Sequence, residues 1–480
     1  FISIKIDREE RPDIDKIYMT FVQATTGGGG WPLNVFLTPD RKPFFGGTYF
    51  PAEPKYGRKT FLDLLNVLSA MWADETKRKD LVEGAGQQFE QLRNHTNLQP
   101  AAGLELSTTW LTNAVNRFKA QYEPKHGGFD QQPKFPRPSV PRFLLAQGVR
   151  SGDAEAVKMV LHTCDAMAAG GIHDHIGGGF ARYSTDARWL VPHFEKMLYD
   201  NAQLVQLYLD AHLVSGEARH AEVVRDIIKY LLRDMTHPDG GFYSAEDADS
   251  EGQEGKFYCW TLDQLTELLD AAELKVVVRH YGITKEGNFE DHSHPEPLKN
   301  LNVLSIVDPK LSAAEARLLG SANAKLFKQR STRVRPGLDD KVLASWNGLM
   351  LGSVARAGAV LNEPKYIAAA EKNLKFVQDQ LWDAESKTLH HRWREGHRDD
   401  VQLLDAYSNM LDGSLHLYEA TLSPKHLEFC IELAESMVKR FYDEKSGGFF
   451  QNGGGDTNLL MRLKEDYDGA EPSGNSVAAL

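Results

Sequence analysis

Histidines, carboxylates and aromatic residues gather in short polar stretches of the chain, each close to the start of a predicted helix. Carboxylates and histidines can transfer protons near neutral pH, while tryptophan and tyrosine rings stack on the apolar faces of sugars. This mixture predicts a small-molecule substrate, most simply a sugar. The candidate acid–base groups are His173, His175, His193, Glu195, Asp247, Asp339, His390 and Asp405, and the candidate substrate-binding residues are Arg182, Tyr183, Trp189, Tyr199, Asp200, Trp346, Asn347 and Tyr407.

These residue types allow two reactions on a sugar. In the first hypothesis, two histidines on opposite faces remove and replace a proton at C2, because epimerisation needs a base on each side. The candidate histidines are His173, His175, His193 and His390. In the second, a carboxylate pair, such as Asp247 with Asp339 or Asp405, hydrolyses a glycosidic bond.

Each polar stretch also has a purely structural interpretation. Asp339 and Asp405 could cap helices or interact with helix dipoles, and Asp247 could lie in a solvated loop. The His173-x-His175 spacing occurs in metal sites, but its only further partner, His193-x-Glu195, is a generic pattern. We therefore predict no metal and no other cofactor.

Composition argues against several classes of partner. The net charge is −12 without a basic run, which disfavours nucleic acid and anionic membrane surfaces. No apolar stretch approaches the roughly 20 residues that span a bilayer. The three cysteines are far apart and form no C-x-x-C pair, which favours a reducing compartment, so we predict a cytoplasmic protein. The oligomeric state is not predicted.

The first hundred residues resemble the C-terminal part of a thioredoxin fold. Strands are expected at Phe1–Ile6, 33–37 and 44–49, with a helix at 17–25, a turn at 38–41 and helices at 61–72 and 81–94. Pro32 begins the second strand, where the fold carries a cis proline, although an ordinary trans proline is the alternative. We place this partial domain at residues 1–98. Because Phe1 begins within a strand and Leu480 ends within a helix, we expect a piece of a longer protein, with any redox C-x-x-C upstream.

A Gly-Gly-Phe unit recurs through the remaining chain, each time between a helix and a polar loop. The helices that follow the polar loops begin about 62 residues apart, with one longer interval, and this spacing predicts six helical hairpins. Six copies favour a closed (α/α)6 toroid at residues 99–480, truncated in its last repeat, over an open solenoid. The loops before the inner helices would then converge on one funnel. The predicted inner-helix starts are Lys134, Glu195, Lys256, Lys341, Asp405 and Asp468.

Eight longer motifs together resemble the thioredoxin-domain proteins of the spermatogenesis-associated type. The resemblance implies a mostly α fold, with an α/β thioredoxin-like domain joined to a toroid similar to N-acylglucosamine 2-epimerases and glycosidases. It implies no settled substrate, so a third hypothesis stays open, in which the toroid binds a ligand without catalysis or serves as a redox adaptor. The motifs are Asp7-Arg-Glu-Glu-Arg-Pro-Asp13, Gly30-Trp-Pro-Leu-Asn-Val-Phe36, Phe44-Phe-Gly-Gly-Thr-Tyr49, Pro133-Lys-Phe-Pro136, Asp174-His-Ile-Gly-Gly-Gly-Phe180, His193-Phe-Glu-Lys-Met-Leu-Tyr-Asp200, Ser345-Trp-Asn-Gly348 and Glu471-Pro-Ser-Gly-Asn475.

Overall fold

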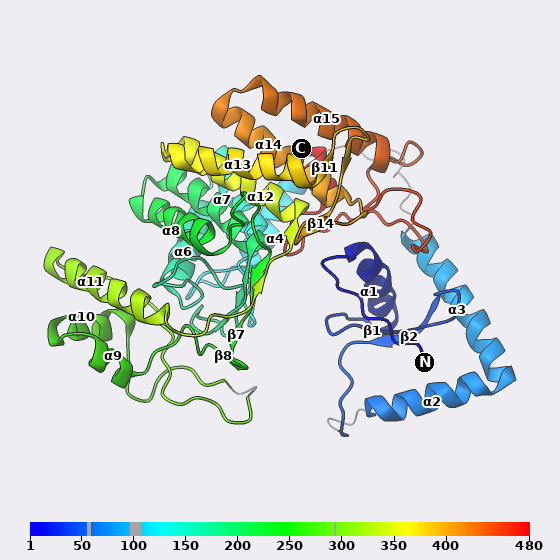
Figure 1. Cartoon of the computed structure of the whole chain (residues 1–480), viewed down its shortest axis with the longest axis horizontal. Coiled ribbons are helices and arrows are strands. Elements are labelled where there is room, and N and C mark those ends of the chain that lie inside the picture. Colours follow the sequence, from blue (N-terminus) through cyan, green and yellow to red (C-terminus); the bar gives the residue numbers. More distant parts are fainter. Residues whose placement is uncertain (55–58, 97–106, 292–293) are drawn as a thin grey trace.

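The computed structural model describes residues 1–54, 59–96, 107–291 and 294–480. The fold is mostly α, with a toroid of paired helices preceded by a partial α/β domain of the thioredoxin type (Figure 1). The predicted domain boundary after residue 98 falls within 97–106, outside the described residues. Among those described, no helix combines the length and apolar character that crossing a membrane requires.

The N-terminal part is a two-stranded antiparallel sheet with one helix against it and two more beyond. Ile17, Phe21 and Val22 from the first helix form its core with Phe89 of the third. Apolar residues from the loop at 459–463 complete this core, so the N-terminal part packs against the C-terminal end of the toroid. Its elements are α1 (Pro12–Thr26), β1 (Asn34–Leu37), β2 (Pro43–Gly47), α2 (Phe61–Ala73) and α3 (Glu75–Thr96).

Most local predictions for this part are confirmed. The Trp31–Pro32 bond is cis, and the Arg41 amide donates to the Thr38 carbonyl at 2.8 Å to close the predicted turn. The strand predicted at Phe1–Ile6 is wrong, since these residues are exposed and form no strand. Alternation of apolar and polar residues indicates one buried face, but the backbone N–H and C=O groups of a strand must also pair with a neighbouring strand. Among the described residues, β1 pairs only with β2.

The toroid has an inner and an outer layer of helices. The inner helices pack against one another in the order α5, α7, α12, α14 and α16, and the outer helices pack against these inner helices. The inner helices α7 and α12 are buried on nearly every side, as expected for central helices. The inner helices are α5 (Ser139–Ser151), α7 (Leu198–Ser215), α12 (Ala344–Val360), α14 (Leu404–Thr421) and α16 (Gly474–Ala479), and the outer ones are α4 (Thr109–Gln121), α6 (Ala154–Ala169), α8 (Ala218–Asp234), α13 (Pro364–Gln380) and α15 (Pro424–Phe441).

Three of the four Gly-Gly-Phe units form clamps that fasten a hairpin to its inner helix. The amide of the phenylalanine donates to an asparagine side chain on the inner helix, which donates back to the phenylalanine carbonyl. The pairs are Phe180 with Asn201 (2.8 and 3.0 Å), Phe242 with Asn347 (2.8 and 3.0 Å) and Phe449 with Asn475 (2.7 and 2.8 Å). The glycines reach left-handed φ values, 83° and 77° before Phe180, which only glycine adopts easily.

The inner helix predicted to begin at Lys256 is wrong. The second clamp joins Phe242 directly to Asn347, so α8 is followed in the toroid by α12, and α7 packs on α12. The residues between them form a separate lobe with its own core around Trp260, Leu265 and Leu326. Capping boxes at its helix starts stabilise the lobe helices locally, so periodicity alone could not tell them from toroid helices. The lobe helices are α9 (Leu262–Leu268), α10 (Ala271–Tyr281) and α11 (Ala313–Arg330).

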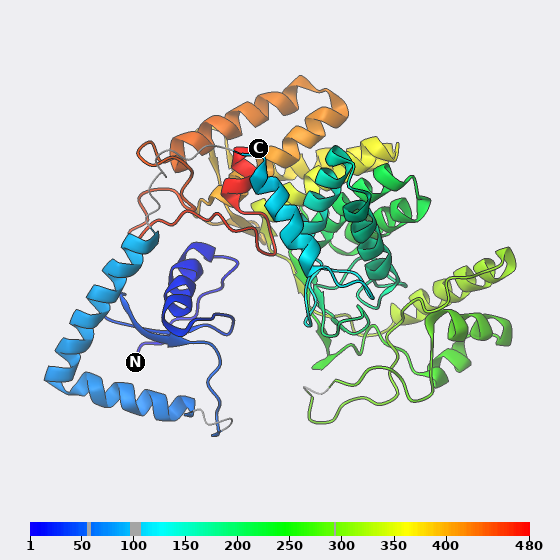
Figure 2. The ribbon, with the colours of Figure 1, turned by 180° about the vertical axis from the view of Figure 1, so that it is seen from behind.

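The lobe and the N-terminal part lie on opposite sides of the toroid in both views (Figures 1 and 2). Short strand pairs hold the loops that lead into the inner helices; β5 directly precedes α7, and β10 directly precedes α12. These strands are β3 (Tyr183–Ser184), β4 (Pro192–His193), β5 (Lys196–Met197), β6 (Ala245–Glu246), β7 (Asp249–Ser250), β8 (Gln253–Glu254), β9 (Leu338–Asp339), β10 (Val342–Leu343), β11 (Trp382–Asp383), β12 (Thr388–Leu389), β13 (Arg392–Arg394) and β14 (His397–Arg398).

Candidate active site

Residues from the starts of three inner helices meet at one end of the toroid. The Tyr199 ring at the start of α7 packs edge-on against Trp346 of α12, with ring centres 4.8 Å apart. The Gln203 amide of α7 donates to the Ala470 carbonyl at 2.8 Å, which brings in the loop before α16. We call the residues gathered here the acid cluster: Arg182, Glu195, Tyr199, Asp200, Trp346 and Glu471.

Asp200 is the most deeply buried acid of the cluster. The residue is 5% exposed, and its Oδ2 atom has no hydrogen-bond partner among the described residues. Burial raises the pKa of Asp200 well above its ordinary value; Arg182 opposes this rise, while Glu471 and Glu195 add to it. Ionisation of the side chain is therefore disfavoured, and its Oδ2 atom is available to bond to a ligand.

Glu471 is a second acid that stays largely protonated. Burial, and then the nearby Asp405, raise the pKa of Glu471 to about 8, although a hydrogen bond from Trp346 lowers it. Burial also raises the pKa of Asp405 to about 6, while a hydrogen bond from the Gly474 amide at the start of α16 opposes this. Asp405 thus disfavours the ionisation of Glu471, and Glu471 disfavours that of Asp200.

Glu195 is the ionised acid of the cluster. Burial would raise the pKa of Glu195, but hydrogen bonds and charges from His193 and Arg182 lower it below its ordinary value. Arg182 Nη1 lies 2.9 Å from Glu195 Oε2, and each of these side chains is 26% exposed, so the cluster reaches solvent. His193 lies between Glu195 (3.6 Å) and Glu254 (2.8 Å) and stacks on Tyr183. Burial would lower the pKa of His193, but these two carboxylates raise it to about 9.

The other candidate histidines lie outside the cluster. His173 bonds through one nitrogen to Asp226 (2.8 Å) and through the other to the Ala168 carbonyl, and it stacks on Phe180. Burial lowers the pKa of His175 to about 3, so it stays neutral. His390 bonds to the carbonyl of residue 399. These imidazoles are engaged in structural contacts.

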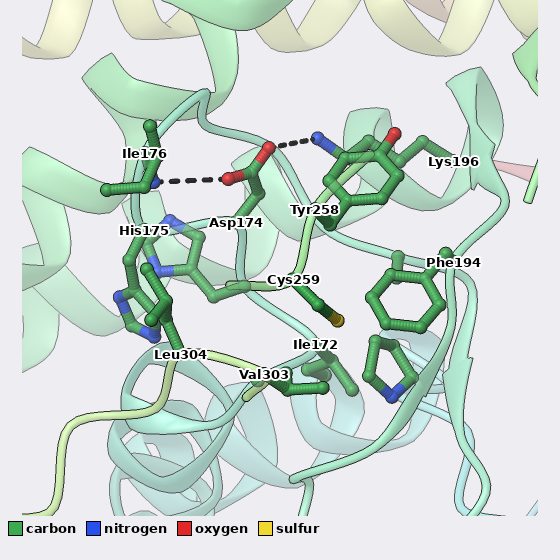
Figure 3. Close-up of a pocket in the computed structure, with 14 residues that line it drawn as sticks. Ile172, Asp174, His175, Ile176, Phe194, Lys196, Tyr258, Cys259, Val303 and Leu304 are labelled. Atoms are coloured by element: carbon green, nitrogen blue, oxygen red, sulfur yellow. Dashed lines mark hydrogen bonds and ion pairs between the residues drawn. The ribbon is translucent and has the colours of Figure 1, made fainter. Parts of the chain in front are cut away.

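His173 and His175 line a small pocket at the junction between the toroid and the lobe (Figure 3). Asp174, between them in sequence, pairs there with Lys196 at 2.8 Å and with Arg330 of the lobe at 2.8 Å. Burial raises the pKa of the Cys259 thiol in the same pocket, which makes it a poor nucleophile. We interpret this pocket as a structural joint.

Comparison with known proteins identifies the family. Residues 1–93 match the family model Thioredox_DsbH, described as a protein of unknown function, DUF255. Human spermatogenesis-associated protein 20 is 40% identical over 522 residues, with 100% of this chain and 66% of the human protein covered. Uncharacterized protein B0495.5 of Caenorhabditis elegans is 35% identical, with 100% of this chain and 69% of that protein covered. The chain belongs to the family of spermatogenesis-associated protein 20.

This member of the family spans 66% of the length of its human relative. A solved sugar epimerase from a ruminal bacterium is similar with a TM-score of 0.35 and 12% identity, covering 78% of this chain and 97% of the epimerase. A likeness at that level says nothing about the chemistry of the acid cluster. Among the described residues, no three His, Cys, Asp or Glu side chains are grouped as metal ligands would be.

Three residues predicted to bind substrate lie outside the acid cluster and bond to other parts of the protein. The fully buried Trp189 donates its indole N–H to the His126 carbonyl at 2.9 Å. Asn347 forms the clamp to Phe242, and the Tyr407 hydroxyl accepts from the Leu389 amide at 2.8 Å. Each of these polar groups is occupied by the protein itself.

The carboxylate pair predicted from Asp247 and Asp339 is not part of the cluster either. Asp247 is exposed and accepts from the Ala248 amide, while Asp339 lies 3.1 Å from the Lys341 ammonium. Glu471 is not among the predicted acid–base groups, although it lies in a polar stretch with Asp466 and Asp468 and opens the Glu471-Pro-Ser-Gly-Asn475 motif.

Proposed function

We propose that the acid cluster is a carbohydrate site with a neutral and an ionised carboxyl group, suited to acid-assisted cleavage of a glycosidic bond. In such reactions one carboxylic acid protonates the leaving oxygen, while a carboxylate activates water or stabilises positive charge. Glu471 supplies an acid that is largely protonated at neutral pH, Asp200 adds a carboxyl group whose pKa burial raises, and Glu195 supplies the carboxylate. Environments that push pKa values apart in this way are typical of acid–base pairs.

The observation that carries the proposal is the unpartnered Oδ2 of Asp200. A buried polar atom without a partner costs roughly 1–3 kcal/mol, so proteins rarely retain one without a purpose. A hydroxyl or glycosidic oxygen of a ligand would satisfy it. The Tyr199 and Trp346 rings of the same cluster pack against each other, and Arg182 can donate to sugar hydroxyls.

The positions of the histidines favour the carboxyl pair over two-histidine epimerisation. A C2 epimerase needs two bases able to accept a proton near neutral pH. His193 is already protonated there, and His173 has both nitrogens bonded to protein groups. A non-catalytic or redox-adaptor role and a cytoplasmic location stay predictions; the three cysteines are buried and form no disulfide.

The test incubates the chain with mono- and disaccharides in D2O and follows proton NMR. New reducing ends are expected, and they should disappear in Asp200→Asn, whereas Asp466→Asn, a change at an exposed acid, leaves the rate unchanged. If Glu471 is the donor, the rate falls as pH rises through about 8, because the acid then ionises. Exchange at C2 without cleavage would reject the proposal in favour of epimerisation, and neither signal would favour binding without catalysis.

A further inference from the structure

The loop at residues 7–11 of the N-terminal part is fastened to the toroid on both sides of Arg8. The Lys341 ammonium, at the start of the strand that leads into α12, lies 3.1 Å from Asp7 Oδ2 and 3.2 Å from Glu9 Oε2. On the other side, His391 Nε2 bonds to the Glu9 carbonyl at 2.6 Å. The Lys341 side chain is 7% exposed, and these contacts form an anchor that holds the backbone on both sides of Arg8.

Arg8 itself projects from this anchored loop, and its charge also acts on Asp15, where it opposes the larger, raising effect of burial on the pKa. Its guanidinium stacks on Trp31 at 3.8 Å from the ring centre, and the Trp31 indole donates to Asp15 at 2.9 Å, which holds the ring in place. Among the described residues, no carboxylate lies within ion-pair distance of Arg8, which is exposed. Stacking on one face leaves the N–H edge of the guanidinium available.

The anchor brings the loop of Arg8 next to the acid cluster, because Lys341 directly precedes β10, which leads into α12, and Trp346 lies in the first turn of that helix. The positive charge of Arg8 acts on the cluster as well. It favours the ionised forms of Tyr199 and Glu471, although burial dominates the pKa of both groups. Glu471 is largely protonated at neutral pH, so it does not neutralise Arg8, and Arg182 is already paired with Glu195. An anionic group on a ligand would be the missing counter-ion, since guanidinium binds carboxylate and phosphate through two parallel hydrogen bonds.

We propose that Arg8 is a ligand-binding residue of the acid cluster and pairs with a carboxylate or phosphate group on the sugar. The binding site is then shared between the two domains, with the toroid holding the sugar ring beside the free Oδ2 of Asp200 and the thioredoxin-like part holding the anion. This inference rests on the proposed function, because it takes the acid cluster as the carbohydrate site.

The test is calorimetric titration of the chain with D-glucuronate, D-glucose 6-phosphate and D-glucose. Arg8→Ala should weaken binding of an anionic sugar at least about tenfold, the loss of a charge-assisted pair, and leave D-glucose unchanged. Lys5→Ala removes an exposed cation from the same segment and should leave all affinities unchanged. Weaker binding of D-glucuronate alone would indicate that Arg8 binds a carboxylate, and weaker binding of D-glucose 6-phosphate alone would indicate a phosphate.

Two results would overturn the inference, and they have different consequences for the proposed function. If sugars bind and Arg8→Ala leaves both anionic probes as tightly bound as before, Arg8 is not the anion site, while the proposed function stands. If none of the three probes binds the unaltered chain, the acid cluster is not a carbohydrate site, and both proposals fail.

Discussion

Asp174 is the anion on which the joint between the toroid and the lobe depends. Its Oδ2 lies 2.8 Å from Lys196 Nζ, and Arg330 of α11 approaches both oxygens at 2.8 and 2.9 Å. The three side chains are 8%, 3% and 5% exposed. We predict that Asp174→Asn, which keeps the shape and removes the charge, destabilises the joint by about 3–5 kcal/mol, because two cations stay buried without their partner.

Several contacts would offset part of that loss. Lys196 keeps its bond to the Gly178 carbonyl at 2.8 Å and its place 4.4 Å from the Tyr230 ring centre. Arg330 keeps its position over Phe257, 5.1 Å from the ring centre. An asparagine Oδ1 can also still accept the backbone amides that Asp174 binds. The lower end, about 3 kcal/mol, is therefore the expected value.

The pH dependence of this effect has a definite sign. Burial alone would raise the pKa of Asp174, but Arg330 and Lys196 hold it well below its usual range. The folded state then binds fewer protons than the unfolded state, so the carboxylate stabilises the fold above its unfolded pKa of about 4. This contribution is lost as the pH falls below about 4. The difference between Asp174→Asn and the unaltered chain should shrink over the same range.

Urea unfolding at pH 7, with hydrogen exchange of α11 as the local probe, measures this effect. Asp263→Asn, at an exposed position on α9, is the matched control and should change the unfolding free energy by less than about 0.5 kcal/mol. If Asp174→Asn behaves like this control, or if its effect is the same at pH 3 and pH 7, the network does not stabilise the joint as argued.

Two further predictions concern the candidate site. Gly474→Ala would place a Cβ 2.4 Å from Asp405 Oδ1, so we expect a loss of roughly 1–3 kcal/mol in thermal unfolding, against little change for Gly454→Ala, whose surroundings are open. His193 should remain protonated in NMR titrations up to about pH 9, and Glu254→Gln should lower its pKa, since one of its two carboxylate partners is removed. An unchanged His193 titration would contradict the assigned pairing.

Sequence patterns predicted the elements whose stability is local. The turn at Thr38–Arg41 and the helical hairpins follow from proline, glycine and apolar periodicity within short windows. The cis Trp31–Pro32 bond was predicted from the resemblance to a thioredoxin fold. The Gly-Gly-Phe repeat pointed to the toroid because each copy needs the same tight turn. It was misassigned in its third copy, since the lobe at 262–330 separates Phe242 from its clamp partner Asn347.

The state of each candidate group was decided by tertiary structure. Sequence placed Asp200, Glu195 and the histidines among the candidates on residue type alone, but it could not rank them. Whether a carboxyl group is neutral depends on burial and on charges brought near by distant segments, as Glu471 and Arg182 are brought to Asp200. The sequence by itself therefore determined the helical toroid and its Gly-Gly-Phe repeat, while only the folded chain decided which acids meet and which of them keep their protons.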